Sequence, residues 1–98
     1  KLIVITEQTV DTAVGDRFRA ALATGGITAE MIVLPAGEGT KSWAQLAALV
    51  DRLLALGVER SDHVVALGGG AIGDLVGFAA AIAKRGCGFV QVPTILLS

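Results

Sequence analysis

The sequence predicts an α/β fold in which a parallel sheet carries helices on both of its faces. Short apolar runs rich in β-branched residues alternate along the chain with longer amphipathic segments, which is the pattern of βαβ units. One of these runs also leads through three consecutive glycines into an Ala-rich segment over residues 64–74. A glycine-rich turn between a strand and a helix is typical of sites that bind phosphate groups.

Four strands are expected, at residues 2–6, 30–34, 63–67 and 88–92. Their central residues are apolar without a polar alternation, so each strand should be covered on both faces, as in buried parallel sheets. The segments between them are long enough for helical crossovers, which are right-handed in such units.

Helices are expected over residues 12–23, 42–56 and about 70–84. In the second helix, Trp43, Leu46 and Val50 recur at helical spacing and should face the core. The third helix is apolar on nearly all sides, so it should be buried on more than one side. Helical spacing also gives the first helix an inner stripe, formed by Val14, Phe18 and Leu22.

Composition excludes several classes of function. The formal net charge of −1 provides no basic surface for nucleic acid, so no nucleic-acid partner is expected. The longest apolar run, residues 75–83, is shorter than the roughly 20 residues that a membrane-spanning helix needs. The single cysteine excludes an intramolecular disulfide and is consistent with the cytoplasm. With 98 residues, no initial Met and an apolar end, the chain should be one domain of a longer protein.

The glycine turn matches a dinucleotide-binding pattern. Gly68, Gly70 and Gly73 satisfy G-x-G-x-x-G between a predicted strand and a predicted helix, so the predicted sheet is Rossmann-like. We expect Gly70→Val to weaken ligand binding and also stability, because a turn of three glycines is expected to be strained. A tight turn that only packs the helix against the sheet is the alternative.

The carboxyl ends of parallel strands share one edge of the sheet, where open α/β folds bind ligands. That edge should carry Glu7, Glu38, Lys41 and Thr94 beside the glycines. Lys41 and free glycine amides suit a diphosphate, and a carboxylate suits a ribose diol. Because the strand after the glycines ends without an acid, the ribose acceptor should be Glu7 or Glu38. Alternatively, Glu38 and Lys41 form a surface pair, and Asp74 only complements the helix dipole.

Four blocks of the sequence resemble the 3-dehydroquinate synthase family, and together they extend over nearly the whole chain. They are residues 35–41, 67–80, 84–86 and 91–97. The resemblance implies the NAD-binding portion of that lyase, which converts 3-deoxy-arabino-heptulosonate 7-phosphate to 3-dehydroquinate with elimination of phosphate, in the shikimate pathway of aromatic amino acid biosynthesis. NAD would be used transiently. A divalent metal, zinc or cobalt, would be bound by a C-terminal helical domain that is absent from this sequence.

The resemblance also implies functional residues by their motif positions. Those that would contact NAD are Glu7, Gly37, Glu38, Lys41, Gly69, Gly70, Ala71, Ile72, Gly73, Asp74, Thr94 and Ile95. Arg85 would reach across a homodimer interface to the phosphate of the substrate. Ile95 replaces a family Thr, and Glu7 replaces a common Asp. The chain should hold no catalytic residue and no metal ligand, since His63 matches no ligand position, and alone it should be inactive.

Other functions share these features. Metal-dependent alcohol dehydrogenases have a similar sheet and glycine turn, although the segments at 77–80 and 84–86 favour the synthase over them. Related sugar-phosphate cyclases are a further alternative. A non-catalytic nucleotide-binding fragment is an alternative from a different class. Since one predicted helix is apolar nearly all round, the chain should expose apolar surface and associate.

Overall fold

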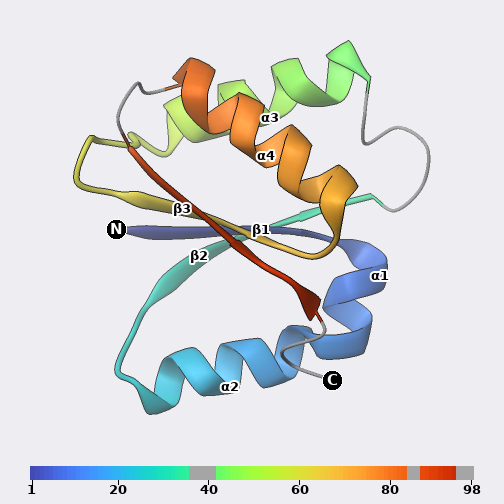
Figure 1. Ribbon diagram of the computed structural model, residues 1–98. Helices are drawn as coiled ribbons and strands as arrows, with labels where there is room; N and C mark the ends of the chain where they lie inside the picture. Colours follow the sequence, from blue (N-terminus) through green and yellow to red (C-terminus); the bar gives the residue numbers. More distant parts are fainter. Residues whose placement is uncertain (36–41, 84–86, 95–98) are drawn as a thin grey trace.

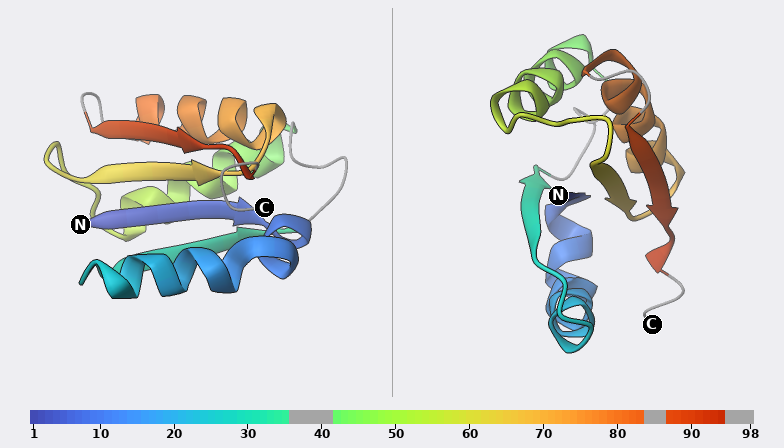
Figure 2. Two further views of the ribbon diagram at one scale, coloured as in Figure 1. Left: turned by 60° about the horizontal axis from the view of Figure 1, so that its bottom comes forward. Right: turned by 90° about the vertical axis from the view of Figure 1, so that its left-hand side faces the viewer.

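The computed structural model describes residues 1–35, 42–83 and 87–94. In this part of the chain the elements follow in the order β1 (Leu2–Glu7), α1 (Gln8–Val10), the π-helical turn η1 (Asp11–Gly15), α2 (Asp16–Thr24), β2 (Ala29–Leu34), α3 (Trp43–Ala55), β3 (His63–Leu67), α4 (Gly70–Ala83) and β4 (Gly88–Val92). The strands form one sheet in the order β2-β1-β3-β4, with parallel pairing throughout (Figure 2). The predicted fold class and the four predicted strands are confirmed.

Helices cover both faces of the sheet (Figure 1): α2 lies on one face, and α3 and α4 lie on the other. Strand residues alternate between the two cores that result. Ile3 and Ile5 of β1 belong to the core under α3 and α4, whereas Val4 packs with Phe18 of α2. Burial on both sides therefore explains why β1 and β3 are apolar without alternation. The expectation is wrong for β4, which lies at the edge of the described sheet and has no buried residue.

The first helical segment begins earlier than predicted, at Gln8, and contains the π-helical turn η1. Asp11 Oδ1 lies 2.8 Å from Arg19 Nη2, and the carboxylate occupies the space where a side chain on Gly15 would stand. Val14 and Phe18 are buried in the core, as predicted from their spacing, and Leu22 packs against them.

Helix α3 begins where the sequence predicts, because Ser42 Oγ accepts a hydrogen bond of 3.1 Å from the Gln45 amide as an N-cap. Its fully buried residues are Leu49 and Leu53. Trp43 was expected in the core but is 83% exposed, so that prediction is wrong. The reason is geometric: Trp43 lies about 100° around the helix axis from the Leu49–Leu53 stripe.

Helix α4 is buried on two sides, against the sheet and against α3, as expected for a helix with few polar residues. Its remaining side is exposed, and it carries Phe78 (67% exposed) and Ile82 (57% exposed). No helix in the described parts of the chain combines the length and the apolar character needed to cross a membrane.

Candidate functional site

The two central strands bring the predicted site together at one edge of the sheet. β1 pairs with β3 through Ile5 and Ala66, so that Glu7, at the end of β1, lies on the same edge as the glycine turn after β3. The chain leaves β1 toward the α2 face and leaves β3 toward the α4 face. In open α/β sheets, ligands bind where the connections that follow two neighbouring strands lead to opposite faces of the sheet.

Gly68 serves the turn itself. Its φ of +148° is a backbone conformation that residues with a side chain rarely adopt. A Cβ atom there would also lie 2.6 Å from Cγ2 of Ile72. Backbone strain is therefore located at Gly68, and the expectation that a side chain at Gly70 strains the turn is not supported, since Gly70 has no positive φ.

Gly69 and Gly70 have a different environment. Apart from the adjacent residues and the backbone of α4 itself, no atom of the described residues lies within 4 Å of the position that a Cβ would take on either glycine. Neither has a positive φ. Nothing in the described fold therefore requires a bare backbone at these two positions, although a ligand lying against the main chain would.

Gly73 allows α4 to approach β4. A Cβ on Gly73 would lie 2.5 Å from Cδ of Gln91, whereas a Cβ on Gly77, one turn later, would make an ordinary contact of 3.5 Å with Phe89. The three glycines of the motif thus divide as in dinucleotide-binding turns: Gly68 shapes the turn, Gly70 leaves the backbone open, and Gly73 permits close helix–strand packing.

The backbone groups around the turn are held in a definite arrangement. The hydroxyl of Thr6, which is fully buried, donates to the carbonyl of Leu67 at 2.7 Å. The Gly68 amide donates to the Val92 carbonyl at 3.0 Å. The Gly69 carbonyl accepts from the Gly73 amide at 3.1 Å and from Gln91 Nε2 at 3.2 Å.

The bond from Gly73 to Gly69 is the first i to i−4 bond of α4, so the preceding amides have no acceptor within the helix. These amides belong to Gly70, Ala71 and Ile72, and they carry the positive end of the helix dipole. The turn is therefore suited to an anion such as a diphosphate.

Other residues predicted for the site differ in position. Ala71 and Asp74 are exposed, whereas the Ile72 side chain is buried, so that only its backbone faces the site. Asp74 is the fifth residue of α4 and lies beyond the first turn, where the dipole acts most strongly. Thr94, two residues after β4, is half-buried on the same edge. Glu7 makes no capping bond to α1.

Five predicted residues lie outside the described part of the chain: Gly37, Glu38, Lys41, Arg85 and Ile95.

Thr6 and Gln91 contribute to the site but were not among the predicted residues. Thr6 is polar within an otherwise apolar strand, which is a weak sign of a buried hydrogen bond. Gln91 similarly interrupts the apolar run of β4. Thr6 belongs to no motif, and the block over residues 91–97 contains Gln91 without assigning it a role.

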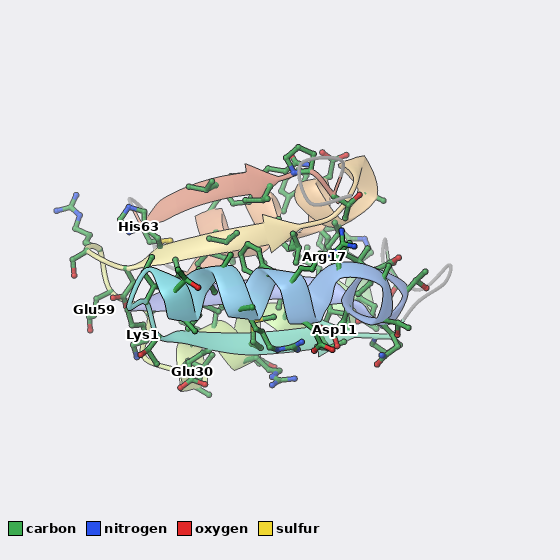
Figure 3. All side chains as sticks on the ribbon, turned by 90° about the horizontal axis from the view of Figure 1, so that it is seen from below. Lys1, Asp11, Arg17, Glu30, Glu59 and His63 are labelled. Carbon is green, nitrogen blue, oxygen red and sulfur yellow. The ribbon has the colours of Figure 1, made fainter. Side chains whose placement is uncertain are left out.

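The opposite edge of the sheet carries Lys1, Glu30, Glu59 and His63, as the labelled side chains of Figure 3 show, with Asp11 toward the other end. His63 is the first residue of β3 and is therefore remote from the glycine turn. In the described residues, no group of three His, Cys, Asp or Glu side chains has an arrangement that would hold a metal ion.

An apolar groove of about 600 Å³ opens between α3 and α4 beside the turn. Ala71 and Asp74 line its end nearest the turn, and its walls include Trp43, Leu75 and Phe78. A second groove of about 390 Å³ lies between α4 and β4 and is bordered by Gly73 and Gln91.

Comparison with known proteins bears on this site. The family model of the 3-dehydroquinate synthase N-terminal domain matches residues 31–98. Over all 98 residues, the chain is 55% identical to the 3-dehydroquinate synthases of Zymomonas mobilis and Caulobacter vibrioides and 56% identical to that of Cereibacter sphaeroides. Each match covers 26% of the relative, so the chain spans about a quarter of the length of these proteins.

Two solved structures are similar in fold. One is 2-epi-5-epi-valiolone synthase from Streptomyces hygroscopicus with NAD+ and Zn2+ bound (TM-score 0.83, 32% identity, 94% of this chain and 26% of that chain). The other is 2-deoxy-scyllo-inosose synthase complexed with carbaglucose-6-phosphate, NAD+ and Co2+ (TM-score 0.78, 29% identity, 95% of this chain and 26% of that chain). On the family match and the identity over its whole length, this chain belongs to the 3-dehydroquinate synthase family.

Proposed function

We propose that this chain binds the diphosphate of NAD at the turn between β3 and α4, within a protein that has 3-dehydroquinate synthase activity. The observation that carries the proposal is the open space beside Gly69 and Gly70, where no described residue occupies the place of a side chain. Glycines that the fold itself does not need are explained by a ligand that approaches the main chain.

Around this turn we assign the remaining contacts by position. Glu7 would accept the hydroxyls of a ribose, and Asp74 and Thr94 would contact the cofactor from either side of the turn. Gly37, Glu38 and Lys41 would contribute on the adenosine side, on the basis of the family resemblance, and Ile95 would adjoin the site without a hydroxyl. The related cyclase structures that contain NAD+ support the choice of cofactor.

The proposed reaction is the cyclisation of 3-deoxy-arabino-heptulosonate 7-phosphate to 3-dehydroquinate with loss of inorganic phosphate. When bound, NAD supplies a reversible hydride acceptor, so the reaction has no net change in oxidation state. The role of the described residues is to bind and orient the cofactor. Their side chains do not suit a metal ion, so zinc or cobalt is assigned to ligands elsewhere in the protein.

Three further assignments belong to the same proposal. The protein would be a homodimer, and Arg85 would contact the substrate phosphate of the partner's site. The protein would act in the cytoplasm, where a chain with a single cysteine remains reduced. A related sugar-phosphate cyclase activity is the second candidate, because both similar structures are such enzymes. The higher identity to the 3-dehydroquinate synthases, 52–56% against 29–32%, favours the first.

The proposal is tested with the full-length protein by calorimetric titration of NAD and by measuring phosphate release from the heptulosonate substrate. Gly70→Val should weaken NAD binding about 5- to 150-fold, since the added methyl groups meet the diphosphate at a cost of about 1–3 kcal/mol. The unfolding temperature of the Gly70→Val variant should differ little from that of wild type, because the space beside Gly70 is open.

Gly25→Val is the matched control. Gly25 has an ordinary φ of −82°, a Cβ there would make contacts of 3.6 Å or longer, and it follows α2, the helix that covers the other face of the sheet. NAD binding should be unchanged in this variant. Equal NAD affinity in wild type, Gly70→Val and Gly25→Val would reject the proposed site.

A further inference from the structure

Gln91 connects the edge strand to the glycine turn. It lies in β4 opposite Ala66 of β3, and its side chain extends toward α4. Its Nε2 donates to the Gly69 carbonyl at 3.2 Å, and its side chain fills the space that a Cβ on Gly73 would need.

This hydrogen bond acts on a peptide group whose carbonyl is otherwise held by a single bond, from the Gly73 amide at 3.1 Å. The peptide between Gly69 and Gly70 is flanked by two residues without side chains, so it can rotate at small steric cost. In a planar trans peptide the carbonyl and the amide point in opposite directions. Holding the Gly69 carbonyl toward Gln91 and the Gly73 amide therefore directs the Gly70 amide to the open side of the turn.

We propose that Gln91 is a positioning residue of the cofactor site, which fixes the orientation of the Gly69–Gly70 peptide so that the Gly70 amide meets the diphosphate. The inference rests on the proposed NAD binding at this turn. Gln91 is not placed in contact with the cofactor, and it acts only through the backbone that it holds.

Gln91→Met tests the hydrogen bond, because methionine fills a similar volume without an amide donor. In the full-length protein, the Kd for NAD should rise about 3- to 10-fold, as expected for the loss of one neutral hydrogen bond. The KM for NAD should rise by the same factor, whereas kcat at saturating NAD should be unchanged. The unfolding temperature should change by no more than that of the control variant.

Thr24→Val is that control. It removes an exposed hydrogen bond of the same kind, from Thr24 Oγ1 to the Ala20 carbonyl at 3.0 Å, at the end of α2. It should leave the Kd for NAD unchanged.

A second pair of variants changes two glycines of α4 that face β4. Gly73→Ala should displace the Gln91 side chain and weaken NAD binding as much as Gln91→Met does. Gly77→Ala adds the same methyl group one turn later in an ordinary contact with Phe89, and should have no effect on NAD binding.

Gly73→Ala should lower the stability, because its methyl group collides with the Gln91 side chain. Adding Gln91→Ala removes that side chain and should restore the stability. The Kd for NAD of the double variant should stay no higher than that of either single variant. Such non-additivity indicates that both changes act through one hydrogen bond.

The outcomes separate the two proposals. If wild type fails to bind NAD, the proposed function and this inference are both wrong. If wild type binds NAD and the Gln91→Met variant binds it equally well, only the role of Gln91 is overturned. Additive losses of NAD affinity in the double variant would also overturn it.

Discussion

Ile72 lies directly over Gly68, with its Cγ2 atom 2.6 Å from the point where a Cβ on Gly68 would stand. Gly68 precedes α4 and Ile72 is the third residue of that helix, where it is 3% exposed in the core. The first glycine of the motif is therefore required by the fold, independently of any ligand.

Gly68→Ala should destabilise the protein by about 1–3 kcal/mol, because a φ of +148° is unfavourable for alanine. The contact with Ile72 adds to this cost. Chemical denaturation of the variant measures the change in the free energy of unfolding. Gly25 has an ordinary φ, so Gly25→Ala should change the free energy of unfolding much less than Gly68→Ala does. A Gly68→Ala variant as stable as wild type would contradict the assigned strain.

Glu7→Gln should weaken NAD binding without unfolding the protein. Loss of a charge-assisted hydrogen bond of about 1.5–3 kcal/mol corresponds to roughly a 10- to 150-fold rise in Kd. Glu30→Gln makes the same chemical change at the start of β2, on the edge of the sheet away from the turn (Figure 3). Titration of NAD into both variants should therefore distinguish them, and equal affinities would exclude Glu7 as the ribose acceptor.

The exposed side of α4 should make the 98-residue chain associate when it is produced alone. Phe78 and Ile82 together present apolar surface that isolated soluble domains seldom leave uncovered. Light scattering at roughly tens of micromolar should show a dimer or larger species. Combining Phe78→Asp with Ile82→Asp should reduce the association, whereas Ile27→Asp, at a site 49% exposed, should not. A monomeric wild-type chain would contradict this prediction.

Cys87 should react slowly with alkylating reagents at neutral pH. Burial raises the pKa of its thiol, and the negative charge of Asp62 raises that pKa further. Since the thiolate is the reactive form, a smaller fraction of the residue is reactive at pH 7 than in a free cysteine. The alkylation rate should rise with pH through a midpoint above that of an unperturbed cysteine thiol. If the midpoint of the Cys87 alkylation rate lay at or below that of free glutathione measured in parallel, the raised pKa would be contradicted.

The strands were predictable because their apolar runs are continuous, and the run from His63 to Leu67 was predicted with its observed bounds. The π-helical turn was not predictable. It coincides with the ion pair between Asp11 and Arg19 and with the missing side chain of Gly15, neither of which has a periodic signature. Trp43 was misplaced for a related reason: helical spacing identifies an apolar stripe but not which part of it faces the sheet.

The motif predicted where the site lies but not how its glycines differ. Gly68, Gly70 and Gly73 are equivalent as letters, and only their neighbours separate strain, open space and close packing. The roles of Thr6 and Gln91 depend on the pairing of β1, β3 and β4, which brings each side chain to a carbonyl far away in the sequence.

The close approach of Gln91 to Gly73 also restricts the rotational setting of α4. Turning the helix about its axis by one residue, about 100°, would press Ile72 or Asp74 into the space now filled by Gln91. Because the amides that begin α4 turn with the helix, a bulky side chain at residue 73 would redirect them as well as displace Gln91.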